Sequence, residues 1–128
     1  MVALFDPDDD HHQHYARVLG SADESFVLHT TWPCVAEASH LLEPVASRAL
    51  LRWMARGAAH VYSFDARQLM AMAEVMEKYS EPRRTRMDFA DASLWWVARQ
   101  TRLRTVLTTD HRDFLRYRLP DGSAFEIV

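Results

Sequence analysis

Two aspartates open the most apolar helix that the sequence predicts. Asp88 and Asp91 are three residues apart at the start of a helix expected over residues 86–99, so their carboxylates share one helical face. Acids at a helix N-terminus are stabilised by the helix dipole, which is a purely structural reason for their presence. Two carboxylates on one face also suit a hard divalent cation. The positions of the other acids help to decide between a structural role and cation binding.

Two further acids lie where a site could form. Glu37 is one turn inside an apolar helix expected over residues 34–42, where an unpaired buried carboxylate would be costly. Asp110 follows a β-branched strand expected over residues 105–109. Ligands of parallel sheets bind beyond the carboxyl ends of the strands, so we expect three segments to offer carboxylates to one region. Crowded carboxylates need a cation, or else their pKa values rise.

The elements that must position these acids alternate along the chain. Apolar and periodic patterns predict strands over residues 26–30, 60–64 and 124–128, and helices over residues 11–19, 47–56 and 65–79, with a helical turn over residues 111–114. This alternation predicts one α/β domain with a mainly parallel sheet and right-handed crossovers. A chain of 128 residues with 48% hydrophobic content can bury a real core.

One helix carries a stripe that has two interpretations. Leu69, Met70, Ala73 and Met76 recur with a period of 3.6 residues in the helix over residues 65–79. Such a stripe is typical of a core face or of a homodimer face, and methionine suits either because its side chain is adaptable. The sequence leaves both open.

Charge is unevenly distributed along the chain. Residues 1–81 carry twelve acids against six bases, whereas residues 82–128 carry six acids against nine arginines. Arginine is well suited to bidentate phosphate contacts, so Arg83, Arg84 and Arg86 are candidates to bind RNA phosphates, with a solvated surface as the equal alternative. Cys34 is the single cysteine, which favours a reducing cytoplasm, and no apolar run is long enough for a membrane span.

The order of these motifs is similar to that of a known family. The matching segments are residues 2–6, 10–12, 30–38, 41–42, 87–94 and 106–114. Together they resemble the PIN-domain family, and its small VapC-like ribonuclease toxins in particular. The resemblance implies a three-layer α/β fold, in which helices flank a mainly parallel central sheet. It also implies an endoribonuclease that depends on Mg²⁺ or Mn²⁺ and uses a quartet of acids.

The same resemblance assigns roles to residues. Glu37, Asp91 and Asp110 match the second, third and fourth acids and are expected to be catalytic metal ligands. Asp88 is expected as a further catalytic carboxylate in the same pocket, and Thr108 as a polar group at its rim. For Asp113, an accessory catalytic role and a structural cap or ion pair are equally supported.

The start of the chain departs from the family pattern. In that family the first acid ends a first strand, which precedes the segment matched by residues 2–6. This sequence begins at Met1, so the resemblance implies that the first acid and most of the first strand are missing as written. We expect the true start to lie upstream of Met1, with a natural truncation as the alternative.

Three functions compete at this point. The first is a metal-dependent endoribonuclease that acts on RNA as the toxin of a type II toxin–antitoxin system and is held by a cognate antitoxin. The second is a catalytically impaired PIN-like module that binds RNA or a partner. A phosphate-accepting receiver domain is disfavoured, because the single lysine, Lys78, does not follow the last pair of strands.

Overall fold

The computed structural model describes residues 1–21, 26–80 and 86–128. The chain forms two compact units, Met1–Tyr62 and Ser63–Val128, and each is described by itself below. Within the described ranges, no helix is long and apolar enough to cross a membrane. The grouping of all 128 residues into one domain stays a prediction.

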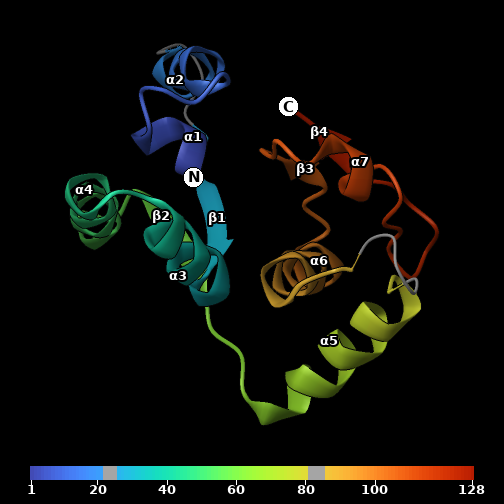
Figure 1. The fold of residues 1–128 in the computed structure, drawn as a ribbon. Helices are drawn as coiled ribbons and strands as arrows, with labels where there is room; N and C mark the ends of the chain where they lie inside the picture. The colour runs from blue at the N-terminus through green and yellow to red at the C-terminus, as the bar shows by residue number, and fades with distance from the viewer. Residues whose placement is uncertain (22–25, 81–85) are drawn as a thin grey trace. The chain divides into compact units, whose positions relative to one another are not determined.

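The first unit consists of helices around a parallel pair of strands. Strand β1 lies parallel to β2, with Thr30 opposite Val61. Its elements are α1 (Val2–Phe5), α2 (His12–Gly20), β1 (Leu28–Thr31), α3 (Trp32–Leu41), α4 (Pro44–Ala55) and β2 (Ala59–Tyr62) (Figure 1).

Prolines set the starts of both central helices of this unit. Thr31 is the N-cap of α3, and Pro33 lies in its first turn, as the sequence predicts. Pro44 lies between the helices expected over residues 34–42 and 47–56, and α3 does end before it. The next helix, α4, begins at Pro44 itself, three residues earlier than expected, because the fixed φ and missing N–H of proline suit the first helical position.

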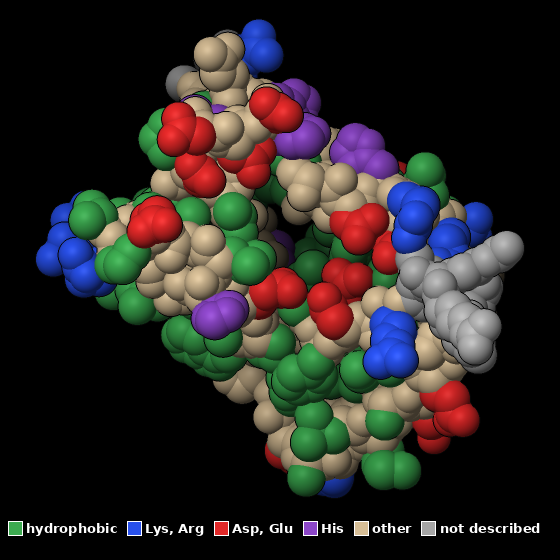
Figure 2. All heavy atoms as spheres, viewed as in Figure 1, with side chains coloured by type: hydrophobic (Ala, Val, Ile, Leu, Met, Phe, Trp, Pro, Cys, Tyr) green, Lys and Arg blue, Asp and Glu red, His purple; other side chains and the backbone are tan. Residues whose placement is uncertain are grey.

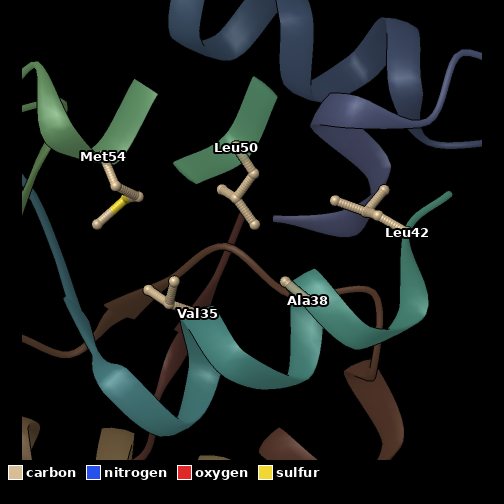
Figure 3. Close-up of a cluster of buried hydrophobic side chains, with 5 residues drawn as sticks. All are labelled: Val35, Ala38, Leu42, Leu50 and Met54. Carbon is tan, nitrogen blue, oxygen red and sulfur yellow. The ribbon is translucent and has the colours of Figure 1, made fainter. Parts of the chain in front are cut away.

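The core of the first unit lies between α3 and α4. Figure 3 shows the side chains of α3 facing those of α4 across this core. The residues are spaced three or four apart along each helix, so each helix buries one face. They are Val35, Ala38, Leu42, Leu50 and Met54.

The second unit also combines helices with a parallel pair of strands. Its elements are α5 (Ala66–Lys78), α6 (Phe89–Thr101), β3 (Thr105–Val106), α7 (His111–Phe114) and β4 (Glu126–Ile127). Strands β3 and β4 pair in parallel, which confirms the parallel pairing expected from the sequence. Both strands are shorter than expected. Their union with β1 and β2 in one central sheet, and the loss of a first strand, stay predictions.

Helix α5 begins where the sequence predicts but buries another face. Asp65 and Gln68 form a reciprocal capping box at its start. Met72 and Val75 are buried, whereas Leu69 and Met70 of the predicted stripe are 42% and 67% exposed. The stripe is therefore not the core face of α5. A homodimer that uses it stays a prediction.

Helix α6 is the centre of the second core. Most of its residues are buried, including Trp95 and Trp96, and α5 packs against it. Arg102 ends the helix in the left-handed conformation, with φ 63°. Aromatic rings complete the core, with Phe114 and Tyr117 each less than 3% exposed.

Candidate active site

Asp88 begins α6 as its N-cap. Its Oδ1 accepts a hydrogen bond of 2.8 Å from the backbone N–H of Asp91. A capping carboxylate satisfies a backbone donor that has no partner within the helix, and it is favoured by the helix dipole. This structural role accounts for the presence of Asp88. Its expected part in catalysis stays a prediction.

Asp91, one turn later, is hydrogen-bonded by Tyr117, a residue that was not predicted from the sequence to belong to the site. Its Oδ2 accepts a hydrogen bond of 2.9 Å from the hydroxyl of Tyr117. Tyr117 is 1% exposed, and a buried tyrosine normally requires a partner for its hydroxyl. The partners are 26 residues apart, so local periodicity contains no signal for this contact.

Asp110 begins α7 in the way that Asp88 begins α6. Its Oδ1 accepts a hydrogen bond of 3.1 Å from the N–H of Asp113. The N–H of Asp110 in turn donates to Oγ1 of Thr108 at 3.0 Å. Thr108 therefore fixes the backbone that carries the Asp110 carboxylate, a more specific role than the polar rim group that was expected.

Asp113 lies among arginine side chains. Its Oδ1 is 3.3 Å from Nη1 of Arg116 and 3.7 Å from Nε of Arg112. The residue is 7% exposed, and buried carboxylates of this kind are normally paired. These contacts support the ion-pair interpretation of Asp113. A catalytic role for it stays a prediction.

The starts of α6 and α7 bring acids to one region of the second unit. Burial raises the pKa of Tyr117 well above its usual range, and the charges of Asp91, Asp113 and Asp110 raise it further. Hydrogen bonds connect these residues. The Tyr117 hydroxyl donates to Asp91, the Tyr117 backbone N–H donates to the Asp113 carbonyl at 3.3 Å, and the Asp113 N–H donates to Oδ1 of Asp110. Tyr117 and Asp113 thus link the acid of α6 to the acid that caps α7.

Glu37 lies in the first unit, on α3, where it is exposed. The costly burial that drew attention to it is therefore absent. Its carboxylate interacts electrostatically with the Met1 ammonium group, whose pKa is lowered by burial although Cys34, Asp9 and Glu37 act to raise it. The membership of Glu37 in one site with the aspartates stays a prediction.

The expected RNA contacts are only partly described. Arg83 and Arg84 lie outside the described residues, and Arg86 is exposed just before α6. A second basic surface was missed. Three exposed arginines are spaced four residues apart, two on α4 and one at its C-cap, and Figure 2 shows basic side chains at the left, where Figure 1 draws α4. They are Arg48, Arg52 and Arg56. Their regular spacing is visible in the sequence, but the RNA-binding residues expected from it all lie within residues 82–128.

The donors in the second unit fit a hard cation that needs few protein ligands. Within the described ranges, no three His, Cys, Asp or Glu side chains are placed to hold a metal ion. Mg²⁺, however, is usually bound through one or two carboxylates and keeps several waters. Asp91 and Asp110, which are linked through Tyr117 and Asp113, supply hard oxygen donors of the kind that Mg²⁺ takes.

Comparison with known proteins identifies the family of the chain. The sequence is 28% identical to Ribonuclease VapC26 of Mycobacterium tuberculosis over 132 aligned positions, which cover 100% of this chain and 94% of that protein. Residues 1–119 match the PIN domain. This match spans most of the chain and includes every predicted site residue, and the chain therefore belongs to the PIN-domain family.

Proposed function

We propose that this protein is a metal-dependent endoribonuclease that cleaves RNA. Proteins of the PIN-domain family are typically nucleases that depend on a metal ion, and the similarity to a VapC ribonuclease extends over the whole chain. The observation that supports the proposal is the chain of hydrogen bonds that links Asp91 at the start of α6 to Asp110 at the start of α7 through Tyr117 and Asp113.

In this proposal, Asp91 and Asp110 hold Mg²⁺ or Mn²⁺, and Glu37 contributes a third carboxylate. The ion, when bound, acidifies a water molecule and neutralises phosphoryl oxygens. Asp88 and Thr108 keep their neighbours in place: Asp88 caps the turn that carries Asp91, and Thr108 binds the backbone of Asp110. Exposed arginines near these turns contact RNA phosphates, which position the strand without reading its sequence.

The proposed biological role is that of the toxin in a type II toxin–antitoxin system. It rests on the similarity to Ribonuclease VapC26. A free ribonuclease of this kind would degrade cellular RNA, so we infer that a cognate antitoxin holds it inactive. Expression of the chain alone is expected to arrest growth, whereas expression of Asp91→Asn is not.

The decisive experiment measures RNA degradation by the purified protein in Mg²⁺ and in EDTA. We expect cleavage in Mg²⁺ that EDTA abolishes. Asp91→Asn should lower kcat by about 100-fold or more, because even residues that only orient metal ligands typically contribute 10- to 100-fold. Asp121→Asn is the matched control, since this exposed aspartate lies in a turn and binds Ser123. Its activity should equal that of the wild type.

A second function competes on one observation. Among the described residues, Glu37 lies in the other unit from Asp91 and Asp110, so a chain whose acids do not act together would be a PIN-like module that binds RNA or a partner without turnover. This alternative predicts that the wild-type protein retains RNA in a gel-shift assay and produces no cleavage at any Mg²⁺ concentration.

A further inference from the structure

Tyr117 is a buried hydroxyl with a charged partner. Its side chain is 1% exposed, and its hydroxyl donates to Oδ2 of Asp91 at 2.9 Å. Hydrogen bonds to a carboxylate are stronger than those between neutral groups and also fix direction. A tyrosine that served only to fill the core would be satisfied by a backbone carbonyl, or could be replaced by phenylalanine.

The tyrosine is itself held from several sides. Its ring packs edge-on against Phe114 and Tyr79, with centroid distances of 5.2 and 5.1 Å. The next residue, Arg118, is fixed through its backbone, because its N–H donates to the Tyr79 hydroxyl and its carbonyl accepts from Nε1 of Trp95, both at 2.9 Å. Trp95 belongs to α6, the helix that also carries Asp91. The phenol oxygen is therefore anchored to the helix whose carboxylate it binds.

The Asp91 carboxylate is held by a group of the protein. Its Oδ2 accepts the hydrogen bond that the Tyr117 hydroxyl donates, and the ring that carries this hydroxyl is packed against Phe114 and Tyr79. The orientation of the Asp91 carboxylate is therefore determined by the protein rather than by a ligand.

We propose that Tyr117 is a positioning residue that orients the Asp91 carboxylate for divalent-cation binding. This inference rests on the proposed function, since it assigns the orientation of a candidate metal ligand of the same site. Groups that hold a metal ligand in place typically change metal affinity or activity by 10- to 100-fold when they are lost. Tyr117 should have an effect in this range although it touches neither RNA nor the ion.

The test removes the hydroxyl and keeps the ring. Tyr117→Phe is compared with Tyr79→Phe, which removes another phenol from the same aromatic cluster. The Tyr79 hydroxyl binds the backbone N–H of Arg118, so its loss changes packing and local stability without touching an acid. Three quantities are measured for each variant: Mn²⁺ affinity by calorimetry, kcat and KM for RNA cleavage, and Tm.

We expect Tyr117→Phe to weaken Mn²⁺ binding and lower kcat by about 10- to 100-fold, with KM for RNA unchanged. Both variants lose one buried hydrogen bond, so both should lower Tm by similar amounts. Tyr79→Phe should leave Mn²⁺ affinity and kcat within about twofold of the wild-type values. In the Asp91→Asn background, Tyr117→Phe should cause no further loss of Mn²⁺ affinity, because the group that it positions is already changed.

Two results would overturn the proposal. One is a Tyr117→Phe protein with wild-type Mn²⁺ affinity, and the other is an equal loss of affinity in both tyrosine variants. The calorimetry also separates this inference from the proposed function. A wild-type protein that binds Mn²⁺ but cleaves no RNA contradicts the ribonuclease proposal, while the effect of Tyr117 on Mn²⁺ affinity still decides the positioning role. A wild-type protein that binds no Mn²⁺ contradicts both.

Discussion

Acidic side chains have different surroundings in the two compact units. In Ser63–Val128, Asp88 and Asp110 cap helices, and Asp91 accepts a hydrogen bond from the Tyr117 hydroxyl. In Met1–Tyr62, Glu37 lies exposed on α3. The comparison teaches that a carboxylate in a candidate site can be oriented by the fold before any ligand arrives. In the second unit, each of these carboxylates is oriented by its own hydrogen bond, and each hydrogen bond can be removed by a single substitution.

The first test of this comparison asks whether Glu37 acts together with the aspartates. Glu37→Gln should lower kcat by at least about 10-fold if its carboxylate serves the same site as Asp91, by the scale of losses typical of metal sites. Tm should stay unchanged, because an exposed side chain adds little to stability. The measurement is RNA cleavage under saturating Mg²⁺.

Glu43→Gln is the matched control, because Glu43 is another exposed glutamate of the first unit and its side chain makes no capping hydrogen bond. Equal activity of Glu37→Gln, Glu43→Gln and wild type would exclude Glu37 from the site. The proposed catalytic residues would then all lie in the second unit.

The next effect compares the two cores. Phe114→Ala, at a residue 2% exposed, should lower the free energy of unfolding by about 3–5 kcal/mol, and Leu50→Ala, at a residue 0% exposed, by about 2–5 kcal/mol. Both losses come from removed apolar burial and from the cavity that is left. Urea unfolding followed by circular dichroism and by tryptophan fluorescence measures them.

The same curves test the prediction of one domain. If the chain is one domain, each variant should unfold in a single transition. Circular dichroism and tryptophan fluorescence should then give the same midpoint. Two transitions, of which only one moves in each variant, would show that the units unfold separately.

The smallest effect compares how the two units end a helix. In the first unit Gly57 follows α4 with φ 81°, whereas in the second Arg102 ends α6 with φ 63°. Left-handed backbone costs residues with a Cβ about 1 kcal/mol or more. Arg102→Gly should therefore raise the free energy of unfolding by roughly 1 kcal/mol, and Gly57→Ala should lower it by a similar amount.

Equilibrium unfolding in urea measures both changes. An added Cβ at Gly57 meets no atom within 4 Å, so the backbone alone should account for the loss. Opposite signs for the two variants are required. A destabilised Arg102→Gly protein would show that the arginine side chain contributes more than the strained backbone costs.

Local sequence signals predicted the helix starts well. Asp65, Asp88 and Asp110 are capping residues in the structure, and each precedes an apolar or helical pattern in the sequence. Capping chemistry acts within four residues, so it can be recognised without knowledge of the fold. The starts of α5 and α7 were predictable for this reason, whereas α6 begins at Phe89, three residues later than expected, so that Asp88 precedes the helix as its cap.

Features that depend on tertiary packing were predicted less well. The stripe containing Leu69 and Met70 has a regular period, but packing against α6 selects Met72 and Val75 instead. The hydrogen bond between Asp91 and Tyr117 joins residues 26 positions apart, and a tyrosine near an apolar segment resembles any core residue. The roles of Thr108 and Asp113 likewise emerged only once their partners were placed.

The capping acids have a consequence for how this protein can change over generations. Asparagine caps helices as well as aspartate does, so Asp88→Asn or Asp110→Asn would preserve the start of α6 or α7 while removing a negative charge. Folding therefore imposes little selection against either substitution, since only the small interaction of the charge with the helix dipole is lost. Under the proposed function, a single nucleotide change could remove one of these charges from the site and still leave a folded protein.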